Sequence, residues 1–450
     1  MSKTKTLDLT SGPILKTLTS LAVPIMASAF LGTAYSITDM AWIGLLGSKA
    51  VAGVGIGGMY TWLSQGLVSL ARMGGQVNVA QSCGKNEREE AKKYASASLQ
   101  LTILFGILFA AVCVIFVHPL IRFFNINDAQ TYECARSYML ITCGLIIFSY
   151  LNFTLTGLFT AQGDSKTPFL ANLAGLVTNM ILDPLLIIGY GPFPRLEVAG
   201  AAIATVSAQA LVLAVLIWGA LRAKPENNVL HTSRLFKPVS GYHYLSICKI
   251  GVPTALQGSV YCMISMALTR MVGVFGPGAV AVQRVGGQIE SLCWNTADGF
   301  GAALNAFVGQ NYGAGKKDRI RKGYHISFRV LVTWGLFITA AFMLFPEPIS
   351  RLFFYETDVI KISVGYLVII GIGEAFMSVE LMTVGALSGL GKTKICSIIS
   401  IILTGARIPL ALLLTQVGLG INGIWWALTL SSIAKGIVFY LTFQRISRKL

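Results

Sequence analysis

Long apolar runs of about 20 or more residues recur along this chain, and a short polar or glycine-rich joint separates each run from the next. A helix needs about 20 apolar residues to cross the hydrocarbon layer of a bilayer. The runs are continuous instead of alternating, which favours helices over the strands of a membrane barrel. Only 12% of the residues are charged, against roughly 25% in a soluble protein. The sequence therefore predicts an all-α integral membrane protein.

The runs predict twelve transmembrane helices. Backbone amide groups in lipid have to be satisfied within their own segment, so each run is expected to be helical along its length. The approximate spans are 15–46, 50–80, 94–117, 134–160, 168–190, 199–222, 246–273, 279–311, 325–346, 362–388, 394–416 and 421–443.

Basic residues are distributed unevenly between the two sets of joints. The joints on the side of the amino terminus, together with both tails, hold 23 of the 35 Lys and Arg residues, whereas the opposite joints hold 6. Positive charge marks the cytoplasmic side of a membrane protein. We therefore expect a multi-pass protein of the cell membrane, inner or plasma, with both termini in the cytoplasm. This topology accounts for the net charge of +16, and no nucleic-acid partner is expected.

An internal repeat divides the predicted helices into two sets of six. Shifting the sequence by 229 residues pairs Pro24 with Pro253 without a gap, and a shift of 228 pairs Tyr138 with Tyr366. Because six is even, both halves have the same orientation and form two six-helix bundles related by a parallel repeat. Many secondary transporters are built in this way.

The repeat and the polar stretch between its halves predict three parts of the chain. The amino-terminal lobe covers residues 1–222 with helices one to six, and the carboxy-terminal lobe covers residues 246–450 with helices seven to twelve. A cytoplasmic linker over residues 223–245 joins the two lobes.

Ionisable residues lie inside the predicted spans, although each costs roughly 2.5–3.5 kcal/mol at the centre of a bilayer. Long basic side chains near helix ends can reach the interface, and Arg72, Arg270 and Lys435 are expected to do so. The carboxylates have shorter side chains and are therefore functional candidates. They are Asp39, Asp183, Glu290, Asp298, Glu374 and Glu380.

Two aspartates lie at the same depth in the first and fifth spans. Asp39 is about seven residues, or roughly 10 Å along the helix axis, from the end of its helix, and Asp183 is equally deep. Asn179 precedes Asp183 by four residues and shares its face of the helix. These three residues are expected to hold a proton or a sodium ion through oxygen atoms. The alternative is that they cap a kink beside Pro184 or bond between helices.

The eighth span carries a polar stripe with an aromatic residue in it. Gln283, Gly287, Glu290, Trp294 and Asp298 recur at spacings of three and four residues. A cleft that accepts cationic, apolar molecules would use a carboxylate for charge and an indole for cation–π contact. Packing in the core is the alternative for Trp294.

Glu374 and Glu380 are six residues apart in the tenth span. Six residues turn an α-helix by about 600°, so the two side chains do not share one tight face. The spacing predicts that only one of them meets the cleft.

The sequence lacks the motifs of several other function classes. No spacing of His and Cys residues suggests a metal site, and no complete phosphate-binding loop of the ATP-driven type occurs. No nucleophile–base pair suggests an enzyme. We therefore expect no cofactor and no catalytic residue, and transport driven by an ion gradient of Na⁺ or H⁺.

The joints resemble those of the multidrug and toxic compound extrusion family, usually called MATE, over nearly the whole chain. The first span ends with Ile37-Thr38-Asp39-Met40 and continues to Gly44, Gly47 and Ala50. The other matching segments are 163–168, 179–184, 200–205, 308–310, 313–315, 385–387 and 389–391.

This resemblance implies an antiporter that exports organic, mostly cationic drugs or toxic compounds in exchange for protons or sodium ions by alternating access. It implies a coupling site made of Asp39, Asn179, Asp183 and Thr205, where sodium is the only metal ion expected. The seventh-span acid of the NorM-like branch is absent, which favours the DinF-like branch. The residues expected to contact substrate are Tyr35, Tyr138, Asn152, Gln257, Tyr261, Gln283, Glu290, Trp294 and Glu374.

Other readings remain open at this point. A flippase for lipid-linked precursors shares the general pattern, but its cleft would be strongly cationic. The cleft residues here are mostly acidic, with Arg284 and Arg407 as exceptions. A channel is disfavoured because duplicated lobes favour alternating access. The expected partners are small organic cations and the lipid bilayer, and the protein is expected to be a monomer.

Overall fold

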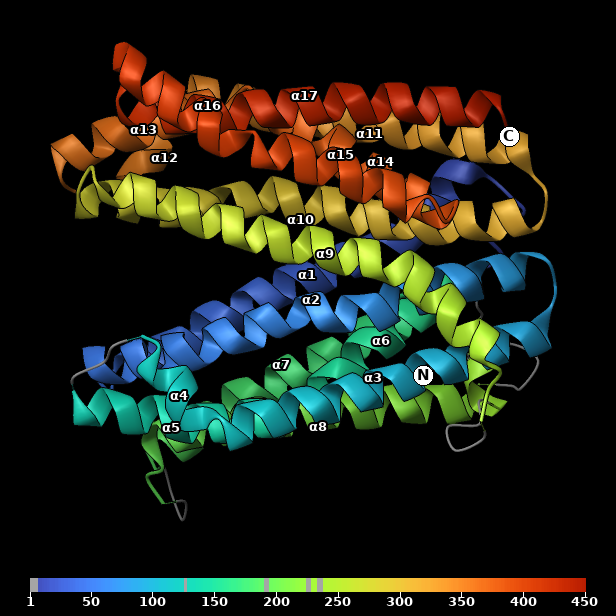
Figure 1. The fold of residues 1–450 in the computed structure, drawn as a ribbon, viewed down its shortest axis with the longest axis horizontal. Helices are drawn as coiled ribbons and strands as arrows, with labels where there is room; N and C mark the ends of the chain where they lie inside the picture. The colour runs from blue at the N-terminus through green and yellow to red at the C-terminus, as the bar shows by residue number, and fades with distance from the viewer. Residues whose placement is uncertain (1–6, 125–127, 190–193, 224–227, 233–237) are drawn as a thin grey trace. The chain divides into compact units, whose positions relative to one another are not determined.

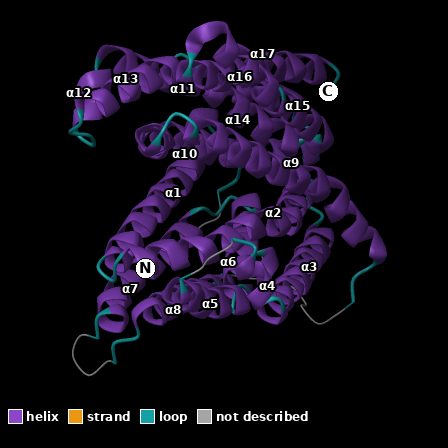
Figure 2. Cartoon of the chain, turned by 60° about the vertical axis from the view of Figure 1, so that its left-hand side comes forward, coloured by secondary structure: helices purple, strands orange, loops and turns teal. Residues whose placement is uncertain are grey.

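The computed structural model describes residues 7–124, 128–189, 194–223, 228–232 and 238–450, and every element in these residues is helical (Figures 1 and 2). Apolar side chains and internally paired amide groups favour helices throughout. The protein is an all-α integral membrane protein with twelve transmembrane helices in two bundles.

The described residues of the first half of the chain form eight helices and a short 3₁₀ turn. They are α1 (Ile14–Gly44), α2 (Ser48–Gly84), α3 (Arg88–Ile115), α4 (Val117–Arg122), α5 (Ala129–Gly144), α6 (Ile147–Ala161), α7 (Lys166–Ile187), α8 (Glu197–Arg222) and η1 (Val229–Thr232).

The second half of the chain forms nine helices and a turn of π-helix. They are α9 (Gly241–Gly273), α10 (Pro277–Gly313), α11 (Lys317–Leu344), α12 (Pro346–Arg351), α13 (Thr357–Gly371), α14 (Glu374–Gly389), α15 (Thr393–Gly405), α16 (Arg407–Leu414), η2 (Thr415–Leu419) and α17 (Ile421–Arg448).

Each predicted span corresponds to one helix or to a run of consecutive helices. In the part of the chain that the structure describes, eight segments are long and apolar enough to cross a membrane as they stand, and two bent pairs bring this number to ten. The pairs α5–α6 and α13–α14 bend by 46° and 50°. The helices α2 and α10, each 37 residues long, complete the twelve spans, and their many glycine and polar residues lower their hydropathy.

The internal repeat appears again in the bounds of the helices. The helices α2, α3 and α4 begin at residues 48, 88 and 117, and α10, α11 and α12 begin 229 residues later at 277, 317 and 346. The bends in the fourth and tenth spans also correspond. The repeat therefore extends to two details that hydropathy does not predict: the bends and the short helices α4 and α12.

The chain divides into two compact units. Unit 1 contains residues 1–8 and 27–255, and unit 2 contains residues 9–26 and 256–450. These units differ from the predicted lobes mainly because residues 9–26 belong with unit 2 and residues 246–255 with unit 1. The chain passes from one unit to the other at three points. One lies between residues 8 and 9, and the other two lie inside a helix, two residues after Pro24 in α1 and two residues after Pro253 in α9. The linker lies partly outside the described residues.

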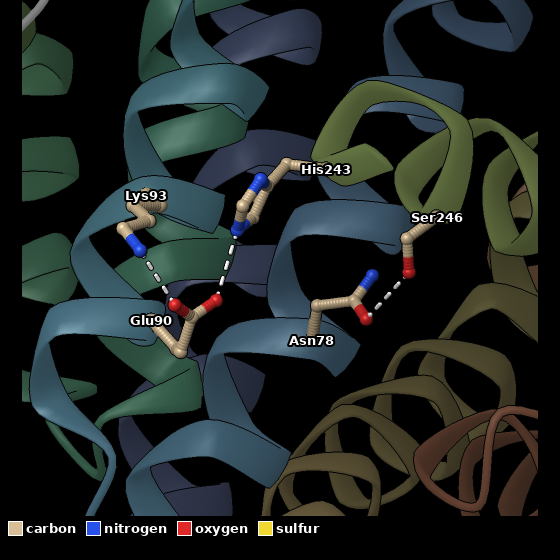
Figure 3. A network of polar contacts seen from close by, with 5 residues as sticks. All are labelled: Asn78, Glu90, Lys93, His243 and Ser246. Carbon is tan, nitrogen blue, oxygen red and sulfur yellow. Dashed lines mark hydrogen bonds and ion pairs between the residues drawn. The ribbon is translucent and has the colours of Figure 1, made fainter. Parts of the chain in front are cut away.

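In unit 1, polar contacts hold the first turns of α9 against α2 and α3 (Figure 3). The buried ring of His243 lies with Nε2 2.9 Å from the Glu90 carboxylate, which also pairs with Lys93 at 2.7 Å. Ser246 donates a hydrogen bond of 3.1 Å to Asn78 Oδ1. This end of α9 is thus joined by its side chains to helices that precede it by about 150 residues.

In unit 2, Arg319 at the start of α11 holds the segment that leads into α1. Its guanidinium donates to the carbonyl oxygens of Leu9, Ser11 and Gly12. Arg319 lies 229 positions after Glu90, so it occupies the equivalent place in the repeat. The two equivalent residues therefore anchor the chain near the start of the helix that opens a half, α9 for Glu90 and α1 for Arg319. They carry opposite charges.

A fixed anion lies in the joint before α5. Asp128 caps the helix by accepting hydrogen bonds from the backbone N–H and the hydroxyl of Thr131, and it pairs with Lys49 at 2.8 Å. The hydrogen bond from Lys49 and those from Thr131 lower the pKa of Asp128 to about 2. The carboxylate is therefore ionised under all physiological conditions.

Glycine allows α10 and α14 to approach closely in unit 2. A methyl group on Gly385 of α14 would collide with the carbonyl oxygen of Gly301 in α10. Small residues permit such backbone approach between membrane helices.

We expect Gly385→Ala to lower the free energy of unfolding by about 1–3 kcal/mol, since the two helices must separate to admit the methyl group. Thermal unfolding of the purified protein in detergent measures this loss. The control is Gly405→Ala on α15, where nothing lies within 4 Å of the added carbon. Equal melting temperatures for the two variants would contradict the assignment.

Candidate functional site

Two buried carboxylates lie in unit 1, on α1 and α7. Asp183 and Asn179 are fully buried, and Asn179 Nδ2 donates a hydrogen bond of 3.1 Å to Asp183 Oδ1. Asp39 is also buried and is close enough to Asp183 for their charges to interact. The spacing of four residues places Asn179 and Asp183 on one face of α7, as expected.

Three oxygen atoms of this group have no hydrogen-bond donor among the described residues. They are Asp39 Oδ1, Asn179 Oδ1 and Asp183 Oδ2. A buried acceptor without a donor costs free energy. Such atoms favour a cation or a proton in their vicinity.

Two tyrosines and a threonine surround the carboxylates. Tyr35 donates a hydrogen bond of 2.9 Å to the hydroxyl of Thr205, which joins α1 to α8. Tyr35 and Tyr138 both lie within the field of Asp39 and Asp183. Tyr138 packs over Gly57 of α2, where a larger residue would collide with its ring. The structure thus brings together Tyr35, Asp39, Tyr138, Asp183 and Thr205.

Asn152 on α6 has a structural contact of its own. Its Nδ2 donates a hydrogen bond of 2.8 Å to the carbonyl oxygen of Gln209, which links α6 to α8. Its Oδ1 is buried and has no donor in the part of the chain that the structure describes. Its role in substrate binding stays a prediction.

Unit 2 contains a cavity of about 260 Å³ that is lined by both polar and apolar side chains. Six of its lining residues were predicted from the sequence, either as substrate contacts or as acids inside the spans, and basic and aromatic residues line it as well. The polar and aromatic side chains of the lining include Tyr261, Gln283, Glu290, Trp294, Tyr366, Glu374, Glu380, Arg407, Ser432 and Lys435.

The polar stripe of the eighth span faces this cavity over most of its length. Gln283, Gly287, Glu290 and Trp294 of α10 line it, whereas Asp298 does not. Gln257 of α9 does not line it either, and its side-chain oxygen accepts a hydrogen bond of 3.3 Å from Ser397. Whether Gln257 contacts substrate stays a prediction.

Both glutamates of the tenth span line the cavity, so the prediction that only one meets the cleft is wrong. An angular separation of this kind keeps two side chains apart only where the space between the helices is narrow, and this cavity is wide enough to receive both. Glu374 begins α14 directly after the bend, and Glu380 reaches the same cavity from farther along the helix.

The prediction that Lys435 extends to the membrane interface is wrong. Its ammonium group forms a buried ion pair of 2.8 Å with Glu380, and the exposed side-chain fractions are 5% and 9%. Burial with a carboxylate partner replaces the contact with water that the interface would supply.

The sequence analysis assigned no role in the site to Tyr366, and it counted Arg407 only as a basic exception among the mostly acidic cleft residues. The Tyr366 hydroxyl donates a hydrogen bond of 3.2 Å to Glu290 Oε2. The repeat supplies a signal for both residues, because they lie 228 positions after Tyr138 and Asn179, two residues of the unit 1 group. Among the described residues, no set of three His, Cys, Asp or Glu side chains is arranged to hold a metal ion.

We expect Lys435→Met to lower the free energy of unfolding by about 3–5 kcal/mol, because it leaves Glu380 buried without its cation. The double variant Lys435→Met, Glu380→Leu should recover most of this loss. Chemical denaturation of the purified protein measures both. Lys361→Met is the control, since that exposed lysine lies 3.8 Å from Asp358 on the surface. A double variant as unstable as Lys435→Met would refute the pairing.

Comparison with known proteins finds relatives that match nearly the whole chain. A probable multidrug resistance protein NorM from Thermotoga maritima is 29% identical to the chain, over 92% of the chain and 88% of that protein. An FAD transporter from Shewanella oneidensis is 24% identical, over 97% of the chain and 96% of that protein.

The fold has solved counterparts. The crystal structure of a mutant of the Vibrio cholerae MATE transporter VcmN matches with a TM-score of 0.90 and 20% identity, over 97% of this chain and 98% of that chain. The MatE family profile matches residues 24–185 and 253–413, once in each half of the repeat. Since these matches cover well over half of the sequence, the chain belongs to the MatE family of membrane transporters and is not an enzyme.

Proposed function

We propose that the protein is a secondary antiporter that exports organic, mostly cationic compounds in exchange for protons or sodium ions. The observation that carries this proposal is the group of buried acceptor oxygens on Asp39, Asn179 and Asp183. Two carboxylates placed together in a low-dielectric region repel each other. A proton, a sodium ion or a cationic substrate nearby relieves that repulsion.

The coupling site of this proposal consists of Asp39, Asn179, Asp183 and Thr205. Carboxylate, amide and hydroxyl oxygens are suitable ligands for a hard cation, and the same carboxylates can instead take a proton. Binding of the ion cancels charge that otherwise attracts a cationic substrate. Coupling then follows from the different affinities of the inward-open and outward-open states for ion and substrate.

The membrane placement is part of the proposal. The excess of basic residues on the side of the amino terminus supports two cytoplasmic termini in a cell membrane. A monomer is sufficient for the proposed cycle, because the coupling residues all come from unit 1. The DinF-like branch agrees with the absence of an acid between Lys249 and Glu290.

The test uses purified protein in proteoliposomes that contain ethidium. A proton gradient and a sodium gradient are imposed separately, and the initial rate of ethidium movement is measured. We expect one gradient to drive transport and Asp39→Asn to slow it at least about tenfold, which corresponds to about 1.4 kcal/mol. The variant keeps the shape of the side chain but cannot carry its negative charge.

The control is Asp358→Asn, since that side chain is 96% exposed on the surface and should leave the rate unchanged. Transport by Asp39→Asn at the wild-type rate would refute the coupling role. Gradient-independent movement of a lipid-linked sugar, without ethidium transport, would favour the flippase instead.

A further inference from the structure

Three glutamates and two basic residues line the cavity in unit 2. Glu290 comes from α10, Glu374 and Glu380 from α14, Arg407 from α16 and Lys435 from α17. The group in unit 1 differs, because its two ionisable carboxylates lie beside an amide and hydroxyl groups. The two units therefore offer different chemistry to a ligand.

One opposite pair in the cavity is already neutralised. Lys435 and Glu380 form their buried ion pair at 2.8 Å. At this distance the two charges compensate each other. The remaining acidic and basic side chains are Glu290, Glu374 and Arg407.

Arg407 has no acidic partner within 4 Å among the residues that the structure describes. Its guanidinium donates to two serine hydroxyls, 3.1 Å to Ser431 and 3.3 Å to Ser432. The residue is only 8% exposed and lines the cavity. A guanidinium does not lose its proton in proteins, so this positive charge persists whichever carboxyls take up protons.

The two remaining acids lie at other positions on the cavity wall. Glu290 accepts the hydrogen bond from Tyr366, and Glu374 contacts Cys293. Glu374 is 1% exposed, and its Oε2 has no donor in the described part of the chain. Tyr261 and Trp294 add aromatic surface, which favours contact with an ammonium group or an aromatic ring.

A simple organic cation suits only part of this cavity. It would satisfy the glutamates but would meet the fixed charge of Arg407. A buried charge without a counter-ion is unfavourable, and an anionic group on the ligand would supply that counter-ion in the planar geometry that arginine prefers.

We propose that the cavity in unit 2 binds amphoteric molecules, with an ammonium group toward Glu290 and Glu374 and a carboxylate or similar oxyanion on Arg407. This proposal rests on the proposed transport function and specifies its substrate class. The volume of about 260 Å³ lies below the roughly 300–1,000 Å³ of sites for drug-sized ligands. The preferred ligand is therefore compact, of the size of an aromatic amino acid.

The repeat gives independent support for a divergence at this position. Arg407 lies 228 positions after Asn179, which contributes an acceptor oxygen in unit 1. The same place in the fold thus holds an acceptor amide in one half and a permanent cation in the other. The side chain at this position attracts cations in one half and anions in the other.

The test is isothermal titration calorimetry on the full-length protein in detergent, without any gradient. Three matched pairs of probes differ only in the carboxylate: tryptophan and tryptamine, tyrosine and tyramine, phenylalanine and phenethylamine. We expect the wild type to bind the carboxylated member of each pair at least about tenfold more tightly. Arg407→Gln should abolish this preference, and Arg407→Lys should restore part of it.

Two further variants separate the proposed contacts from general damage. Arg270→Gln removes an exposed arginine of α9 that does not line the cavity, and the preference should remain. Glu374→Gln should weaken binding of all six probes while the carboxylated members stay preferred, because the ammonium group loses a partner.

Equal or tighter binding of the amines to the wild type would overturn the proposal. So would an unchanged preference in Arg407→Gln, or no binding of any probe to a wild type that transports ethidium. In each of these cases gradient-driven ethidium transport would leave the antiporter function intact. Failure of all gradient-driven transport would instead reject the function itself.

Discussion

An ionisable side chain inside a membrane-spanning helix has to find its partners within the protein, because hydrocarbon provides none. Most polar features of this structure follow from that constraint. Lys435 is buried against Glu380 and does not extend to water, and Tyr366 donates to Glu290. Asp39, Asn179 and Asp183 meet the constraint only in part, since one oxygen of each lacks a donor among the described residues. This incomplete pairing is the observation on which the proposed coupling site rests.

The two halves meet this constraint with different residues on a common framework. Their helices begin at equivalent positions, and Gly57 and Gly286 each receive the ring of an equivalent tyrosine, Tyr138 or Tyr366. The charged residues do not follow the repeat in the same way. The framework is therefore preserved by packing, which tolerates little change in volume, whereas the polar groups are free to specialise because each set is compensated locally within its own unit.

The sequence predicted the bounds of the twelve spans to within about six residues, except for an amino-terminal extension of eight residues in α11, because a helix across lipid has a length set by the bilayer. It also identified the pairing of Asn179 with Asp183, which depends only on neighbours along one helix. It missed the bends in the fourth and tenth spans, since hydropathy measures composition and not direction. It also missed the ion pair of Lys435 and the exposure of both Glu374 and Glu380 to one cavity. These features depend on contacts between helices, which the sequence alone does not reveal.

The opposite charges of Glu90 and Arg319 mean that the two halves of the chain are no longer interchangeable. Both hold the chain near the start of a first helix, one through an imidazole and the other through backbone carbonyls. If the two halves arose by duplication, each copy has since acquired an anchor that the other cannot replace. In a tandem fusion of two amino-terminal halves, a glutamate would face the carbonyl oxygens that the Arg319 guanidinium now binds. One half can therefore no longer replace the other.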